Sequence, residues 1–211
     1  MRSIVDAAPG APQALQLVLL SGGFIVAEDF VRHGFIARLR ERGIECPVTI
    51  AEVRMAYFAD DSLASRLASV LRSVRAQGGQ RVWIAGVSLG GLAALCHAAH
   101  DESLAGLALF SPYPGTRPVL REIEQAGSLE RWADATGPTD AEREAWLWLA
   151  RRTPGNPPVH AWYGSGDRFS AGQRQLARAL PGDNVHEIAG GHDWPDWREM
   201  WDRFLETDSL R

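Results

Sequence analysis

The sequence is poor in cysteine and has no long apolar run. Only two of its 211 residues are cysteines, Cys46 and Cys96, and we interpret both as free thiols of a protein in a reducing compartment. Residues 1–12 lack the apolar core of a signal peptide, and the apolar run 15–20 is too short to span a membrane. The sequence therefore predicts a cytoplasmic protein without a membrane partner.

Charges of one sign do not cluster anywhere along the chain. The formal net charge is −4, from 22 basic and 26 acidic residues, and neither sign forms a long block. This pattern argues against a nucleic-acid-binding surface, so no nucleic-acid partner is expected. Internal repeats and low-complexity segments are also lacking. A chain of this length suits one domain with a substantial core, so residues 1–211 are treated as a single domain.

The most informative stretch is 81–92, where strand-forming apolar residues lead into the motif Gly-Val-Ser-Leu-Gly-Gly at 86–91 and then into a helical pattern. This is the sequence form of a nucleophile elbow, a sharp turn that presents a serine between a strand and a helix. Gly86 and Gly90 have no Cβ, which lets the two arms approach each other. Ser88 is the predicted nucleophile. The alternative is an ordinary glycine-rich turn whose serine caps the helix.

Apolar runs and helical stripes alternate along the rest of the chain. Residues 1–13 are expected to be a frayed lead-in. Helical patterns separate strand-like runs at 15–20, 44–55 (centred on 48–50), 82–85, 104–110, 159–163 and 185–188. One helix is expected over 28–42, and capping pairs are expected at 139/142 and 170/173. This alternation predicts an α/β fold with a sheet of about six mainly parallel strands and helices on both faces.

Polar residues follow three of the predicted strands, where active groups of such folds belong. A serine hydroxyl needs an adjacent base, which His192 can supply for Ser88, and Asp167 can orient that histidine. The alternative for Asp167 is a turn aspartate that caps the helix near Phe169. Asp193 is a second candidate acid, but as the neighbour of His192 it would point away from the ring and suits a helix N-cap.

The order Ser, Asp, His at these strand ends resembles the α/β-hydrolase superfamily over residues 15–205, and the Gly-Gly-His-Asp-Trp-Pro-Asp-Trp segment at 190–197 resembles esterase-D-like proteins. The resemblance implies a compact member that lacks the two antiparallel strands preceding the strand usually counted third. It also implies an oxyanion hole built from the N–H of Leu89 and a second N–H in the loop after the first strand. Gly23 is the first choice for that donor and Phe24 the second.

Residues 115–156 carry helical patterns and no strand, between the fourth and fifth predicted strands. The resemblance implies that this insertion forms a small helical cap. Candidate substrate-binding residues are Phe24, Tyr113 and Trp146, with packing of the cap onto the core as the alternative role for the tryptophan. A cap of this size favours small or medium acyl groups over long lipids.

The implied chemistry requires no metal and no organic cofactor. His97 and His100 share the elbow helix, but no third ligand of suitable spacing accompanies them. The loop 21–23 lacks the patterns of phosphate-binding loops. The resemblance predicts a serine hydrolase that cleaves a small or medium carboxylic ester or thioester, its small-molecule partner, through an acyl-enzyme on Ser88. The alternatives are an acyltransferase with the same three residues and a non-catalytic protein of this fold that binds a small ligand.

Overall fold

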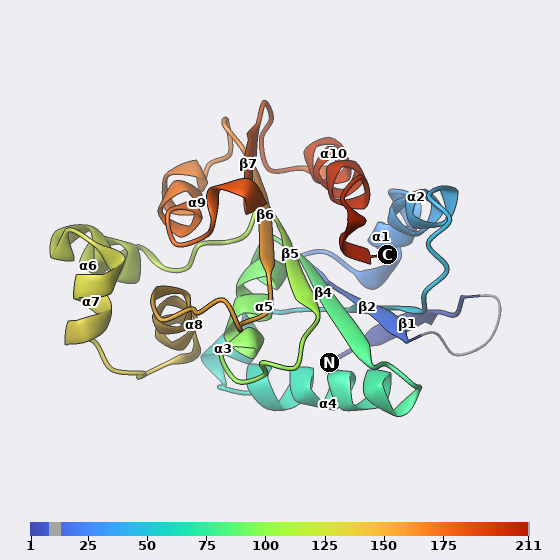
Figure 1. The fold of residues 1–211 in the computed structure, drawn as a ribbon, viewed down its shortest axis with the longest axis horizontal. Coiled ribbons are helices and arrows are strands. Elements are labelled where there is room, and N and C mark those ends of the chain that lie inside the picture. The colour runs from blue at the N-terminus through green and yellow to red at the C-terminus, as the bar shows by residue number, and fades with distance from the viewer. Residues whose placement is uncertain (9–13, 211) are drawn as a thin grey trace.

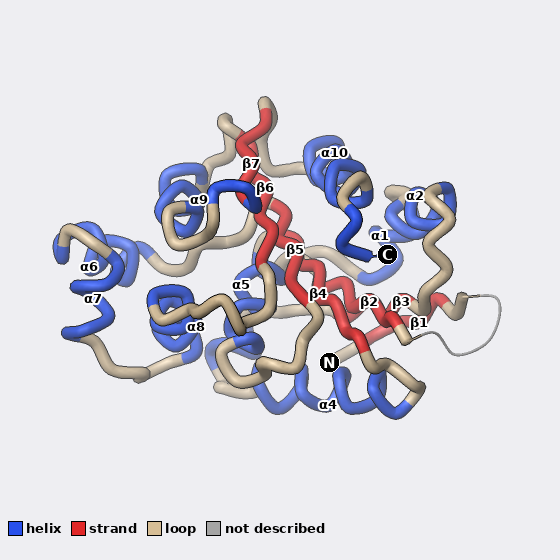
Figure 2. The backbone as a smooth tube through the Cα atoms, in the orientation of Figure 1, coloured by secondary structure: helices blue, strands red, loops and turns tan. Residues whose placement is uncertain are grey.

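A seven-stranded sheet forms the centre of the computed structural model, which describes residues 1–8 and 14–210 (Figure 1). The strand order is β1-β3-β2-β4-β5-β6-β7 (Figure 2). The strands are β1 (Ser3–Asp6), β2 (Leu15–Leu20), β3 (Val48–Ala51), β4 (Arg81–Val87), β5 (Gly106–Phe110), β6 (Val159–Gly164) and β7 (Val185–Ile188). Every neighbouring pair is parallel except β1 and β3. The predicted α/β fold with a mainly parallel sheet is confirmed, with one strand more than expected.

The additional strand is β1, which pairs antiparallel with β3 at the edge of the sheet. Residues 3–6 are therefore not a frayed lead-in, and the expectation that no antiparallel strand precedes β2 is wrong. The pattern in four residues is too short to stand out from sequence. The strand is held by Ile4, which packs against the core, and by Arg2, which is bonded to Glu52. Residues 9–13 of the expected lead-in lie outside the described residues.

Helices cover both faces of the sheet (Figure 1). On one face lie α1 (Ala27–Arg32), α2 (Phe35–Glu41) and α10 (Trp194–Leu205). On the other lie α4 (Leu63–Ala76), α5 (Leu89–Ala98), α6 (Arg117–Ala126), α7 (Leu129–Ala135), α8 (Ala141–Ala150) and α9 (Ser170–Ala177). The short helix α3 (Ala56–Ala59) precedes α4, and two 3₁₀ turns occupy Gly182–Asn184 and Asp208–Leu210.

Side chains of the central strand β2 alternate between two apolar cores. Val18 and Leu20 belong to the cluster beneath α4 and α5, whereas Leu17 and Leu19 belong to the cluster beneath α2 and α10. All four are fully buried, and burial of each such side chain stabilises the fold by about 1.5–3 kcal/mol. A strand covered on both faces has a near-continuous apolar sequence, and the run 15–20 fits this pattern with Gln16 as its one polar residue.

The helix predicted over 28–42 is two helices. Gly34 lies between α1 and α2 with φ 82°, a left-handed conformation that interrupts the helical hydrogen-bond ladder and that glycine adopts without strain. The apolar positions nevertheless serve as predicted at Phe35 and Leu39, which are fully buried, while Val31 is half exposed.

Two helix starts differ from the predicted capping pairs. At α8 the carboxylate of Asp140 accepts the N–H of Arg143, and Glu142 accepts the N–H of Thr116 instead of capping its own helix. At α9 no side chain caps the first turn. Gln173 of the predicted pair is instead almost fully buried and faces the site described below.

The segment between β5 and β6 extends one face of the core. Its helix α8 lies against α5, and Trp146 belongs to the same buried cluster as Leu89 and Ala93. Figure 1 shows α6, α7 and α8 beside the sheet, on the α5 side. These helices were expected to cover the ends of the strands, but they lie beside the sheet instead, with α8 packed against α5.

Both cysteines have the predicted state: Cys46 and Cys96 are buried and unpaired. In the described part of the chain, the helices are too short or too polar for any of them to cross a lipid bilayer.

Candidate active site

Four loops converge where the parallel strands end. Gly22 and Gly23 follow β2, Ser88 follows β4, Asp167 follows β6 and His192 follows β7. From β2 the chain moves outward to β3 and then returns to the other side of β2 as β4. The loops after β2 and β4 thus flank the point where the strand order reverses, which is where open α/β sheets bind ligands.

Ser88 is held in a strained turn between β4 and α5. Its backbone has φ 51° and ψ −115°, a conformation that costs a non-glycine residue about 1–3 kcal/mol. A Cβ on Gly86 would collide with the backbone of Gly90, and one on Gly90 would collide with the backbone of Leu20. The Ser88 side chain does not cap α5, so the alternative of a capping serine does not describe this turn.

Backbone hydrogen bonds to the adjacent strand fix this turn. The N–H of Ser88 donates to the carbonyl of Phe110 at 3.0 Å, and the carbonyl of Ser88 accepts the N–H of Tyr113 at 2.8 Å. The end of β5 and the loop after it therefore bind the N–H and the carbonyl of Ser88, which supplies the structural support that a strained residue needs.

The three polar residues predicted from sequence are hydrogen bonded in a line. His192 Nε2 lies 2.9 Å from Ser88 Oγ, and His192 Nδ1 lies 2.7 Å from Asp167 Oδ2. An ionised carboxylate can only accept, so Nδ1 carries the proton and Nε2 of the neutral ring is free to accept the serine hydroxyl. This tautomer is the one in which a histidine can remove a proton from serine.

Asp167 is buried and receives three hydrogen bonds. Oδ2 accepts from His192 and from Nε2 of Gln173 at 2.9 Å, and Oδ1 accepts the N–H of Phe169 at 2.8 Å. Burial alone would raise the pKa of this carboxyl, but the bonds from His192, Phe169 and Gln173 outweigh it and the pKa is lowered. Asp167 therefore has both predicted roles: it is bonded to the histidine, and it accepts the N–H of Phe169 as a turn aspartate would.

Gln173 is one of the site residues that were not predicted from the sequence. It is 1% exposed, and besides Asp167 its side-chain N–H₂ reaches the carbonyl of Pro112 at 3.1 Å. A signal was present: Gln173 precedes the buried Leu176 of α9 by three positions and the buried Leu180, just after this helix, by seven. A polar side chain on such a stripe needs a buried partner.

The loop that carries His192 is fastened to the start of α10. The N–H of Gly191 donates to Asp196 at 2.7 Å, and the side chain of Asp193 accepts the N–H of Asp196 as the predicted helix cap. Burial, together with the charge of Asp193, raises the pKa of Asp196 although Gly191 bonds to it. Asp193 is thus occupied at the helix start, and the acid bonded to His192 is Asp167.

Aromatic rings enclose the imidazole of His192. Phe169 and Trp197 each meet it edge to face, with ring centroids 5.1 and 5.2 Å away. Tyr113 packs edge to face on Phe169 in turn. This packing fixes the ring orientation that the two hydrogen bonds of His192 require.

The loop after β2 lies against the serine turn. A Cβ built on Gly22 would be 3.4 Å from Ser88 Cβ, and one built on Gly23 would be 3.6 Å from the Leu89 side chain. Among the described residues, the N–H groups of Gly23 and Leu89 have no hydrogen-bond partner. Two free donors beside one serine are the arrangement that an oxyanion hole requires.

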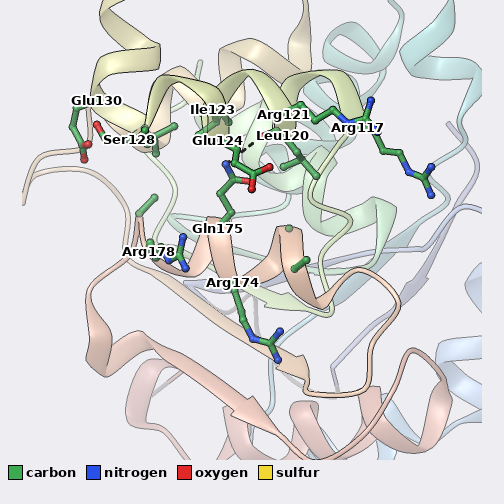
Figure 3. A pocket seen from close by; sticks show the side chains of 15 residues that line it. Arg117, Leu120, Arg121, Ile123, Glu124, Ser128, Glu130, Arg174, Gln175 and Arg178 are labelled. Atoms are coloured by element: carbon green, nitrogen blue, oxygen red, sulfur yellow. Dashed lines mark hydrogen bonds between the residues drawn. The ribbon is translucent and has the colours of Figure 1, made fainter.

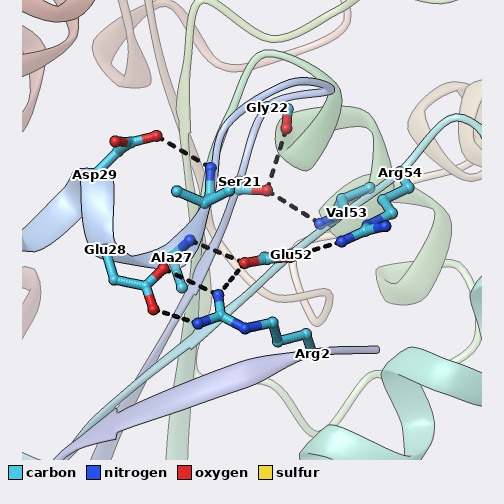
Figure 4. Close-up of polar contacts among 10 residues, drawn as sticks. Arg2, Ser21, Gly22, Ala27, Glu28, Asp29, Glu52, Val53 and Arg54 are labelled. Carbon is cyan, nitrogen blue, oxygen red and sulfur yellow. Dashed lines mark hydrogen bonds and ion pairs between the residues drawn. The ribbon is translucent and has the colours of Figure 1, made fainter.

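Polar contacts behind this loop hold it in place (Figure 4). Ser21 Oγ accepts the N–H of Val53 and donates to the carbonyl of Gly22, both at 3.1 Å. Nearby, buried Glu52 accepts the N–H of Ala27 at 3.2 Å and is bonded to two arginines, Arg2 and Arg54. Burial would raise the pKa of Glu52, but these partners lower it. Arg2, which directly precedes β1, therefore helps to hold Glu52 against the start of α1, just beyond the loop that carries Gly23.

A pocket of about 370 Å³ opens above Ser88 and His192. Its wall is mostly apolar and consists of Gly22, Gly23, Phe24, Ile25, Met55, Ser88, Leu89, Tyr113, Arg168, Phe169, His192 and Trp197. Phe24 and Tyr113 lie in this wall, as the sequence suggested. Trp146 does not: it is buried in the core, where its indole N–H donates to the carbonyl of Pro114 at 3.1 Å. Its assignment to substrate binding is therefore corrected to packing.

A second, larger hollow of about 750 Å³ lies between α6, α7 and α9 (Figure 3). Arginines and glutamates such as Arg121, Arg178 and Glu124 surround it. Neither Ser88 nor His192 belongs to its described lining, so the smaller pocket is the candidate reaction site.

The two histidines on α5 have structural partners. His97 is hydrogen bonded to Asp101 at 3.1 Å, and His100 is hydrogen bonded to Glu144 at 2.8 Å. In the described ranges 1–8 and 14–210, no group of three or more histidine, cysteine or acidic side chains is arranged to hold a metal ion.

Solved structures share this architecture. The fluorophosphonate-binding serine hydrolase F of Staphylococcus aureus, with substrate bound, is similar with a TM-score of 0.71 and 17% identity over 96% of this chain and 85% of that one. S-formylglutathione hydrolase of the same organism has a TM-score of 0.72 and 16% identity at the same coverage. A monoacylglycerol lipase of Paleococcus ferrophilus has a TM-score of 0.63 and 15% identity, over 100% of this chain and 99% of that one. The fold is thus that of an α/β hydrolase.

The family within this class follows from the sequence. The model of the Esterase family, described as "Putative esterase", matches residues 38–205. The chain therefore belongs to the Esterase family, and it is an ester-hydrolysing enzyme. No curated protein sequence matches it significantly.

Proposed function

We propose that this esterase hydrolyses small or medium carboxylic esters or thioesters through an acyl-enzyme on Ser88. The observation that carries the proposal is the hydrogen-bonded line from Ser88 Oγ through His192 to buried Asp167, at the base of an apolar pocket. The pocket volume of about 370 Å³ is at the small end of ligand sites, which favours short or medium acyl groups.

The first half of the reaction forms the acyl-enzyme. His192 Nε2 removes the hydroxyl proton of Ser88 while Oγ bonds to the carbonyl carbon of the ester. The carbonyl oxygen becomes an oxyanion that accepts the N–H groups of Leu89 and Gly23, and loss of one such donor costs about 3 kcal/mol of barrier. Asp167 remains ionised and stabilises the imidazolium. The first tetrahedral intermediate then collapses: His192 gives its proton to the leaving alcohol or thiol, the bond between that group and the carbonyl carbon breaks, and the acyl-enzyme on Ser88 remains.

The second half releases the acid. Water then attacks the acyl carbon with His192 as the base, and Ser88 recovers its proton when the second intermediate breaks down.

A fluorophosphonate probe tests this assignment. We expect intact-mass and peptide analysis to find one label, on Ser88, and to find none in Ser88→Ala. Labelling and p-nitrophenyl acetate turnover should fall about 10³-fold or more in His192→Ala and in Asp167→Asn. Ser73→Ala, a serine exposed on α4, is the matched control and should behave as wild type. Equal labelling of wild type and Ser88→Ala would refute the proposal, and ligand binding without labelling or turnover would favour the non-catalytic alternative.

A further inference from the structure

One permanent cation stands in the mostly apolar wall of the pocket. Arg168 is the only described lining residue with a permanent charge, and no carboxylate belongs to that lining. It is exposed, and within the described part of the chain it forms no ion pair and no side-chain hydrogen bond. Its guanidinium is therefore free to bind a ligand.

Aromatic stacking places this guanidinium near the reacting groups. Arg168 Cζ lies over the ring of Phe169, 4.9 Å from its centroid, and the same ring meets His192 with centroids 5.1 Å apart. One phenyl ring thus separates the cation from the imidazole. A cation–π contact of this kind restrains a flexible side chain without using its N–H donors.

We infer that Arg168 selects esters whose acyl or alcohol part carries a carboxylate. This inference rests on the proposed function and names its substrate class. With the ester carbonyl at Ser88, the apolar part of the substrate lies along Phe169 and Tyr113 and its carboxylate meets the guanidinium at the pocket mouth. The planar fork of an arginine matches a carboxylate with two parallel hydrogen bonds.

The exposure of Arg168 limits how strongly it can favour substrates with a carboxylate. An ion pair in contact with water is partly screened, so the expected preference is about threefold to tenfold in kcat/KM rather than several orders of magnitude. Screening also makes the preference depend on salt, which separates it from a preference due to shape.

A charge series on one scaffold tests the inference. The substrates are 3-acetoxybenzoate, its neutral methyl ester and the cationic 3-acetoxyphenyl-trimethylammonium ion, assayed with wild type, Arg168→Gln and Arg168→Lys. Each variant is compared with wild type on the same substrate, which cancels the different reactivities of the three leaving groups. Arg72→Gln, an exposed arginine on α4, is the control for net charge.

We expect Arg168→Gln to lower kcat/KM for the anionic ester about threefold to tenfold, mainly through KM, to leave the neutral ester within twofold and to improve the cationic ester. The kcat/KM of Arg168→Lys for the anionic ester should lie between the values of wild type and Arg168→Gln. In 0.5 M salt the difference between wild type and Arg168→Gln on this ester should disappear. Equal changes on all three substrates, or the same selectivity change in Arg72→Gln, would overturn the inference while the neutral ester still reports esterase activity. Failure of wild type on the neutral ester and on p-nitrophenyl acetate would instead refute the proposed function.

Discussion

Gln173 donates a hydrogen bond to the Oδ2 atom of Asp167, the same oxygen that accepts from His192. Its amide also bonds to the carbonyl of Pro112, so one side chain joins the loop after β5 to the acid after β6. Within the described residues, Oε1 of Gln173 has no partner. The side chain is therefore held by its donor end, where it fixes the carboxylate.

Replacement of Gln173 with alanine should slow catalysis without weakening substrate binding. A lost hydrogen bond to a charged group is worth about 1.5–3 kcal/mol, so we expect kcat for p-nitrophenyl acetate to fall about tenfold or more while KM changes less than twofold. Gln175→Ala on the same helix, which loses a bond to the carbonyl of Leu120, is the control and should keep kcat. An equal loss of kcat in both variants would indicate a general effect on α9.

Phe24 should contribute to substrate binding and little to folding. Its side chain is 101% exposed although it lines the pocket, so Phe24→Ala removes almost no buried area. We expect the free energy of unfolding in urea to change by less than about 0.5 kcal/mol. The KM for p-nitrophenyl butyrate should rise severalfold, with a smaller effect on the acetate. A loss of stability with unchanged KM would contradict this role.

Asp101 should make stability depend on acid pH. Burial raises its pKa, but hydrogen bonds from Ser103, Arg75 and His97 outweigh burial and lower the pKa to about 2. Because the folded-state pKa lies below the unfolded value, the ionised group stabilises the fold above about pH 4 and loses this effect as the pH falls toward 2.

The variant Asp101→Asn tests that dependence. We expect the free energy of unfolding in urea to fall by about 1–2 kcal/mol at pH 7, allowing for the partial exposure of Asp101. The difference in this free energy between the variant and wild type should narrow between pH 4 and pH 2. Asp134→Asn, at an exposed aspartate of α7, should give no such difference. A difference that stays constant with pH would mean that the charge of Asp101 is not its source.

Gly90 should tolerate no side chain. A Cβ there would overlap the backbone of Leu20, which cannot move aside as a flexible side chain can. We expect Gly90→Ala to cost about 3 kcal/mol or more, or to displace the serine turn and abolish labelling by the fluorophosphonate. Gly137→Ala meets no atom within 4 Å and should be neutral in both thermal unfolding and labelling. Full activity in Gly90→Ala would refute this account of the turn.

The core of the fold was predictable because its signals are local. The apolar runs of β2 and β4 and the glycines around Ser88 follow from burial on both faces and from the close approach of two backbones. The sequence order of Ser88, Asp167 and His192 at the strand ends also identified the residues that the structure brings together.

The remaining features depend on contacts between distant segments. β1 is short and is secured by Ile4 and by the contact of Arg2 with Glu52, which no local pattern reveals. Trp146 could be placed on a helix from sequence, but whether α8 covers the pocket or lies against α5 depends on tertiary packing. Gln173 lies only six residues after Asp167, but its second partner, the carbonyl of Pro112, belongs to the distant loop after β5.

The lateral position of α8 has a consequence for the kinds of ester that can enter. None of the described residues from 115 to 150 lines the pocket, and the outer wall is formed by the exposed side chains of Phe24, Met55 and Arg168. Under the proposed mechanism, only the few atoms around the ester carbonyl have to reach Ser88, and the part of the substrate beyond these three exposed side chains can stay in water.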